Sequence, residues 1–128
     1  MHAEKRMRKI LIVDDEGDID ILTRQRFRKE IKAGKYDFFF AQDGLQALEI
    51  LENGLMVDVV VTDVNMPEMN GFELLLKMKS LYPEVKTIIV SAYSDDKSRQ
   101  TAKSSGADFF LTKPLDFKVF QETLEALF

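Results

Sequence analysis

The chain has 128 residues, of which 45% are apolar and 31% charged, and its length allows one compact domain with a core but no second domain. Its formal net charge of -4, with acidic and basic residues interspersed, gives no general reason to expect nucleic-acid or membrane binding. It has no cysteine, which excludes disulfides and thiolate chemistry, and no apolar stretch of the about 20 residues that span a bilayer, so we expect a cytoplasmic protein.

Short apolar runs alternate with amphipathic patterns in the first half of the chain. We expect a tail at residues 1–8, which holds the single histidine, His2, and one domain over residues 9–128. Runs rich in β-branched residues are typical of buried strands, and apolar residues three or four apart are typical of helices. The expected elements are a strand at Lys9–Val13, a helix from Asp18 with Ile19, Leu22, Phe27 and Ile31 on its apolar face, a strand at Phe38–Ala41, and a helix capped by Asp43 that carries Ala47, Leu48 and Leu51.

The second half continues the alternation, with one weaker segment. Residues 94–105 stand where a helix is expected, but they are rich in Ser, Thr and Asp, so we predict a weak helix there. The other expected elements are a strand at Val57–Asp63, a helix with Phe72, Leu75 and Met78 that Pro83 closes, strands at Val85–Val90 and Ala107–Leu111, and a last helix with Phe117, Phe120, Leu124 and Leu127. Five strand–helix units predict an α/β fold, with a parallel five-stranded sheet covered by helices on both faces.

Polar side chains stand where four of these strands end. Asp14 and Asp15 follow the first strand, Asp63 ends the third, Ser91 follows the fourth and Lys113 follows the fifth. In open parallel sheets the ligand crevice lies outside the carboxyl ends of the strands, so we expect these groups to meet. Three carboxylates in one crevice repel each other, which implies a cation, and an all-oxygen set of this charge suits Mg²⁺.

Such a site fits phosphoryl transfer to an aspartate. Asp63 could act as the nucleophile and form an aspartyl phosphate. Ser91 could supply a hydroxyl, Lys113 a positive charge, and the backbone of Val64–Met66 an oxygen ligand for the metal. Each residue also has a plainer interpretation, because a strand-ending aspartate can cap a helix, and a serine or lysine here can belong to a solvated turn. Their joint placement at the strand ends favours the phosphoryl-transfer site over these plainer interpretations.

Four motifs carry a resemblance to a known family. They are Asp14-Asp15, the pattern D-x-x-M-P-x-M-x-G at Asp63–Gly71, Ser91-Ala92 and Lys113-Pro114. In this order the chain resembles, from about Lys9 to Phe128, the receiver domain of two-component response regulators. The resemblance implies a flavodoxin-like, three-layered (βα)5 fold with strand order 2-1-3-4-5, and it implies that Asp63 takes a phosphoryl group from a histidine kinase or a phosphotransfer protein.

The resemblance also implies a role for each site residue. Asp15 and Asp63 would bind Mg²⁺ directly, Asn65 would offer its backbone carbonyl, and Asp14 would act through metal-bound water. Ser91 and Lys113 would sense the phosphoryl group. Phe110 stands at the position of the family's switch aromatic, which is often a tyrosine. A tyrosine hydroxyl can hydrogen-bond in one rotamer, whereas Phe110 has only apolar burial to favour one rotamer, so its conformational bias is weaker than that of a tyrosine. Asn65 and Tyr93 would set the phosphoryl lifetime.

As a whole, the resemblance implies a signalling switch with weak intrinsic aspartyl-phosphate phosphatase activity, and no conventional enzyme. Phosphorylation would change the surface around the fourth helix (94–105), the fifth strand and the fifth helix. Because residues 94–105 have little apolar surface to hold them down, we further expect this segment to be mobile without phosphorylation and to order on activation or partner binding. The expected output is a downstream protein or a fused output domain, with no direct nucleic-acid or membrane binding; a free-standing protein and a fragment stay open. The basic residues Arg24, Arg28 and Lys29 on the first helix fit either a kinase-docking surface or an ordinary solvated face.

Rival functions fit the motifs less well. A haloacid-dehalogenase-like phosphatase has D-x-D at its nucleophile, whereas Asp63 is followed by Asn65 at the second acidic position. A calcium loop is disfavoured because Pro67 and Glu68 stand where an EF-hand needs a ligand and a glycine. The main alternative is a phosphorylation-silent receiver fold that serves only as an interaction module.

Overall fold

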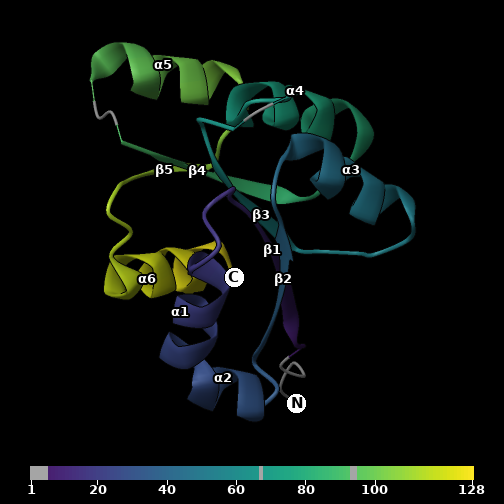
Figure 1. Cartoon of the computed structure of the whole chain (residues 1–128), viewed down its shortest axis with the longest axis vertical. Coiled ribbons are helices and arrows are strands. Elements are labelled where there is room, and N and C mark those ends of the chain that lie inside the picture. Colours follow the sequence, from purple (N-terminus) through teal and green to yellow (C-terminus); the bar gives the residue numbers. More distant parts are fainter. Residues whose placement is uncertain (1–5, 67, 93–94) are drawn as a thin grey trace.

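A computed structural model describes residues 6–66, 68–92 and 95–128 of the chain. Within these ranges the chain forms one sheet with helices on both faces (Figure 1). All neighbouring strands are parallel, and their order is β2-β1-β3-β4-β5, so the predicted fold class and strand order are confirmed. The strands are β1 (Arg8–Val13), β2 (Tyr36–Ala41), β3 (Val59–Asp63), β4 (Lys86–Ser91) and β5 (Phe109–Thr112).

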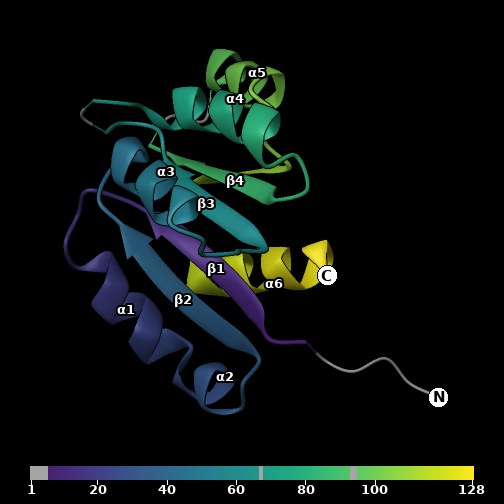
Figure 2. The same cartoon turned by 90° about the vertical axis from the view of Figure 1, so that its right-hand side faces the viewer.

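The helices form two outer layers. The helices α1, α2 and α6 cover one face of the sheet, and α3, α4 and α5 cover the other, as the two perpendicular views show (Figures 1 and 2). Their bounds are α1 (Ile19–Arg26), α2 (Arg28–Lys32), α3 (Gly44–Glu52), α4 (Gly71–Leu81), α5 (Asp96–Ser104) and α6 (Phe117–Leu127). No helix of the described residues is long and apolar enough to cross a membrane.

The core lies on both sides of the sheet, because successive strand residues point to opposite faces. On β1, Ile10 and Ile12 belong to the cluster under α1, α2 and α6, whereas Leu11 and Val13 belong to the cluster under α3 and α4. A central strand buried on both faces has no polar alternation, which explains why β1 and β3 appear in the sequence as continuous apolar runs.

The first helical segment differs from the prediction. It is two helices that meet at Phe27, whose backbone leaves the helical region at φ -104° and ψ 21°. The Phe27 ring is fully buried among the aromatic rings of β2 and α6. Within α1, Leu22, which was expected on the apolar face, is 48% exposed, whereas its neighbour Thr23 is fully buried.

The other predicted helices are present. As predicted, Asp43 caps α3, with its carboxylate accepting a hydrogen bond from the backbone N–H of Gln46 at 2.8 Å. Helix α5 buries Ala102 alone among its nine residues, as its polar sequence indicated. The predicted strands differ from the observed ones by one or two residues at their ends, most clearly where Val57 and Ala107 lie outside β3 and β5.

Candidate functional site

Three carboxylates meet at the carboxyl ends of the two central strands. Asp63 is the last residue of β3, and Asp14 and Asp15 directly follow β1, which pairs with β3. One oxygen from each of the three carboxylates lies within 4.8 Å of the others. The side chains range from buried (Asp63) to exposed (Asp15), so the cluster opens to solvent on one side. A compact set of hard oxygen ligands with an open side fits Mg²⁺, which keeps several waters when it binds to proteins.

The backbone on both sides of Asp63 holds its carboxylate in place. Every residue of β3 is buried, and Asp63 is paired with Val90 of β4 in the register. After the strand the chain turns back, and the N–H of Gly71 donates to the carbonyl of Val64 at 3.0 Å. A Cβ atom on Gly71 would lie 2.3 Å from the carbonyl oxygen of Asp63, so the close approach of α4 to the strand end requires glycine here.

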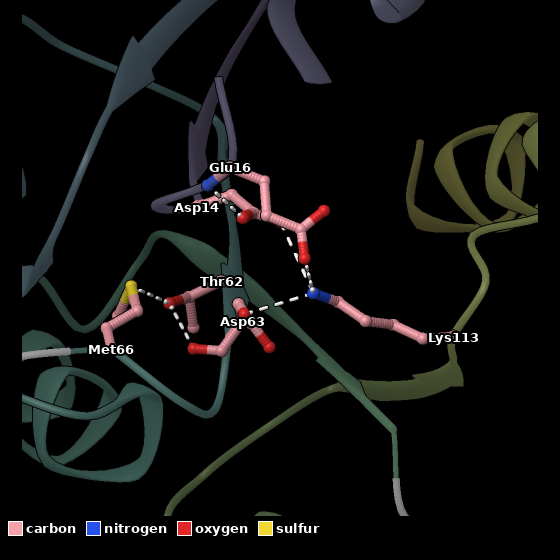
Figure 3. Close-up of polar contacts among 6 residues, drawn as sticks. All are labelled: Asp14, Glu16, Thr62, Asp63, Met66 and Lys113. Carbon is pink, nitrogen blue, oxygen red and sulfur yellow. Dashed lines mark hydrogen bonds and ion pairs between the residues drawn. The ribbon is translucent and has the colours of Figure 1, made fainter. Parts of the chain in front are cut away.

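Lys113 reaches this cluster from the end of β5 (Figure 3). Its Nζ lies 3.1 Å from Oδ2 of Asp63 and 3.7 Å from Oδ2 of Asp14. The backbone N–H of Lys113 donates to the carbonyl of Ser91 at 2.8 Å, so β4 positions the lysine. Burial alone would lower the pKa of Lys113, but the hydrogen bond to Asp63 and the carboxylates of Asp14 and Glu16 outweigh it and raise the pKa. The lysine is therefore charged at neutral pH.

Asp14 shows the electrostatic cost of this arrangement. Burial raises its pKa, and the hydrogen bond from the backbone N–H of Glu16 and the charge of Lys113 offset only part of that rise. The neighbouring charge of Asp63 raises it further. A single lysine does not balance the acidic cluster, which therefore still favours a bound cation.

The structure describes three of the remaining predicted residues. Ser91, the last residue of β4, is 1% exposed. Asn65 lies exposed in the loop two residues after Asp63. Phe110 is half-buried on β5 beside the small cluster of Leu75, Ile89 and Ala102, with the Arg99 guanidinium 4.8 Å from its ring centroid. Tyr93 lies outside the described residues.

A cavity of about 220 Å³ opens beside the cluster, between α1 and the segment that leads from β5 into α6. Asp14, Asp63 and Lys113 line its polar end, together with Glu16. The rest of its wall is largely apolar and includes Ile19, Leu22, Leu115 and Phe117. Leu22, whose exposure the helical pattern did not predict, therefore forms part of the wall of this cavity.

Glu16 was not predicted as part of the site. Its Oε1 lies 3.7 Å from Nζ of Lys113. The signal available in the sequence was its position directly after the acidic pair, but that position does not reveal where a long exposed side chain points. In the sequence Gly71 appears only as the last residue of the D-x-x-M-P-x-M-x-G motif, and its close approach to the carbonyl of Asp63 is a tertiary feature.

Comparison with known proteins identifies the family. The model of the response regulator receiver domain matches residues 10–125. The chain belongs to this family. Receiver domains are signalling switches of two-component systems, and they obtain phosphate from histidine kinases or phosphotransfer proteins.

Individual relatives agree with this assignment of a receiver domain. Sporulation initiation phosphotransferase F of Bacillus subtilis is 37% identical over 91% of this chain and 90% of its own length. Sensor kinase CckA of Brucella abortus is 34% identical over 92% of this chain, which spans only 12% of that protein. The response regulator TrrA of Thermotoga maritima, solved in complex with Mg²⁺ and BeF, is 29% identical with a TM-score of 0.79, covering 95% of this chain and 100% of that one. The relatives thus include a protein of nearly the same length and a much longer one.

Proposed function

We propose that this receiver domain accepts a phosphoryl group on Asp63 and passes the signal on by a change of surface. The observation that carries the proposal is the position of the Asp63 carboxylate. It is 6% exposed at the end of a central strand, 3.1 Å from the amine of Lys113 and within 4.8 Å of two further carboxylates. A carboxylate held beside a cation and a potential metal site is placed to act as a nucleophile toward phosphorus.

In the proposed reaction an oxygen of Asp63 attacks the phosphorus of a phosphohistidine on a kinase or phosphotransfer protein. The bond from phosphorus to nitrogen breaks, and its electron pair leaves with the imidazole. The ammonium group of Lys113 then pairs with the phosphoryl oxygens in place of the Asp63 carboxylate. The Ser91 hydroxyl is proposed to donate a hydrogen bond to one of these oxygens.

The residues also fit Mg²⁺. Asp15 and Asp63 would hold it directly, Asn65 through its backbone carbonyl and Asp14 through water. When bound, Mg²⁺ neutralises the clustered carboxylates and the oxygens of the phosphoryl group. In the absence of the metal, the negative charge of the cluster opposes the approach of a phosphate.

The proposed output is a change around α5, β5 and α6, with Phe110 as the switch aromatic. We propose that Asn65 and Tyr93 set the lifetime of the phosphoryl group, which is lost through a weak intrinsic phosphatase activity. The receiver unit is proposed to be residues 9–128, preceded by the tail 1–8; the family match over residues 10–125 supports this boundary. Three further expectations stay predictions. They are a downstream target protein or fused output domain, a kinase-docking role for the first helix, and a cytoplasmic location.

Intact mass spectrometry tests this function. The protein is incubated with acetyl phosphate with and without Mg²⁺, as wild type and as Asp63→Asn. We expect the wild type to gain one phosphoryl group only when Mg²⁺ is present, and the variant to gain none. No gain by the wild type, from acetyl phosphate or from a phosphorylated histidine phosphotransfer protein, would instead favour the phosphorylation-silent interaction module.

A further inference from the structure

The proposed function leaves Glu16 without a role, although its carboxylate contacts Lys113. The side chain of Glu16 is 73% exposed, whereas that of Asp63 is 6% exposed, and Lys113 lies between them at 3.7 Å and 3.1 Å. Figure 3 shows the Glu16 carboxylate directed toward the lysine Nζ. The amine of Lys113 thus has one carboxylate on its buried side and another toward solvent.

The backbone holds Glu16 at this position. Its N–H donates to Oδ1 of Asp14 at 2.8 Å, so the start of its side chain is fixed to the acidic pair even though its carboxylate is solvated. Glu16 also belongs to the polar end of the cavity that adjoins Asp63 and Lys113. A small phosphodonor that reaches Asp63 with its leaving group in this cavity therefore comes within electrostatic range of Glu16.

We propose that Glu16 is a specificity-determining residue that makes the site discriminate against phosphodonors of higher negative charge. The inference rests on the proposed function, since it concerns the donors from which Asp63 takes its phosphoryl group. Two effects act in the same direction. The carboxylate repels an approaching dianion, and it competes with the donor for the positive charge of Lys113. A donor with a cationic leaving group experiences less of this repulsion.

Two small donors differ in the required way. At neutral pH acetyl phosphate is a dianion, whereas phosphoramidate carries an ammonium group next to phosphorus and is a net monoanion. With either donor an oxygen of Asp63 bonds to phosphorus. The bond from phosphorus to the leaving group breaks, and the electron pair departs with acetate in the first case and with ammonia in the second. The product on Asp63 is the same, so a difference between donors reports on the approach and the leaving group.

The test measures initial rates of phosphoryl uptake by intact mass spectrometry, at low ionic strength and saturating Mg²⁺. For Glu16→Gln we expect the ratio of the acetyl phosphate rate to the phosphoramidate rate to rise by about threefold, the effect of one charge removed at about 7 Å in a water-like medium. Glu16→Lys should raise the ratio further. Glu16→Asp, which keeps the charge, should restore a ratio close to that of the wild type.

A matched control and the ionic strength separate charge from structure. Glu84 is exposed in the turn before β4, at the opposite end of the sheet, so Glu84→Gln removes the same charge without changing the ratio. Higher ionic strength should shrink the effect of Glu16→Gln, because the charge is exposed and therefore screened.

Three results would overturn the inference. The first is an unchanged ratio in both Glu16→Gln and Glu16→Lys, and the second is an equal acceleration with both donors. The third is an effect that disappears when the Mg²⁺ concentration is raised further at constant ionic strength, because Glu16 would then act through metal affinity. If the wild type takes a phosphoryl group from neither small donor nor from a phosphorylated histidine phosphotransfer protein, the proposed function itself fails, and this outcome is distinct from the other three.

Discussion

Thr23 carries a buried hydroxyl with no hydrogen-bond partner among the described residues. Valine has the same shape without the polar atom, so Thr23→Val should raise the free energy of unfolding by about 1 kcal/mol. Thr123 is a matched control: it is also buried on a helix, but its hydroxyl donates to the carbonyl of Val119 at 2.8 Å. Thr123→Val should give no such gain. Urea unfolding of both variants measures the difference, and a Thr23→Val protein less stable than wild type would contradict the prediction.

Asp14 should oppose folding at neutral pH when no divalent cation is present. Folding raises its pKa, chiefly through burial, so the stability that its protonated form provides is complete below the unfolded value of 3.8 and is lost as the pH rises through the folded pKa. Asp14→Asn should therefore match the wild type at low pH and exceed its stability at pH 7, in thermal unfolding with a chelator.

Magnesium should reverse this order of stability between the wild type and Asp14→Asn. A ligand present at a hundred times its dissociation constant stabilises the folded state by about 2.7 kcal/mol. The wild type should gain about that amount from Mg²⁺, while Asp14→Asn gains less because it has lost a carboxylate from the cluster. An equal gain in both proteins would show that Asp14 takes no part in holding the cation.

At the scale of single residues, the strand-end positions predicted which groups would meet. Asp14, Asp15, Asp63 and Lys113 converge because the carboxyl ends of parallel strands share one edge. The ion pair of Glu16 with Lys113 could not be predicted in this way, because it depends on the rotamer of an exposed side chain. The exposure of Leu22 also escaped prediction, since α1 buries the polar neighbour Thr23 and leaves the apolar Leu22 half exposed.

Among the secondary-structure elements, the junction of β3 with α4 should be the most sensitive to a small substitution. Gly71→Ala would place a methyl group 2.3 Å from the carbonyl oxygen of Asp63, so the strand end or the helix start must move. We expect a loss of about 1–3 kcal/mol in the free energy of unfolding, and slower phosphoryl uptake. Gly17→Ala is the control, because no heavy atom lies within 4 Å of its added Cβ. Equal stability of the two variants would contradict this account of the junction.

Helix α5 should be less stable locally than α4. It buries only Ala102, whereas α4 buries four residues and has a capping box formed by Asn70 and Glu73. We expect the amides of α5 to exchange with solvent at least about tenfold faster than those of α4 in the unphosphorylated protein. After phosphorylation the exchange in α5 should slow. Uniformly strong protection of α5 before phosphorylation would exclude the ordering of this segment as part of the switch.

The order of helices and strands was predictable because their apolar periods differ, but the interruption at Phe27 was not. Its ring lies 5.1 Å from that of Phe38 and 5.8 Å from that of Phe120, between residues of β2 and α6 that are remote in sequence. Tertiary packing of this kind overrides a continuous helical pattern. The observed starts of β3 and β5 differ from the predicted ones for a related reason. Pairing with the neighbouring strand, and not apolarity, determines where a strand begins.

In the whole molecule, alternation of strands and helices was enough to predict a parallel sheet covered on both faces, whereas the order 2-1-3-4-5 came from the resemblance to receiver domains. That order places β3 between β1 and β4 and so surrounds Asp63 with the ends of its neighbours. The fold thereby explains why one strand carries the proposed phosphoacceptor: it is the strand whose end the acidic pair, the serine and the lysine can all approach.

The measurement that tests the central claim most directly is identification of the phosphorylated residue. The wild type is treated with acetyl phosphate and Mg²⁺ and reduced with borohydride, which converts an aspartyl phosphate to homoserine, and peptide mass spectrometry then locates the change. Our account predicts homoserine at position 63 and aspartate at positions 14 and 15. Homoserine at either of those two positions, or phosphate retained on a hydroxyl side chain, would contradict the assignment of Asp63 as the phosphoacceptor.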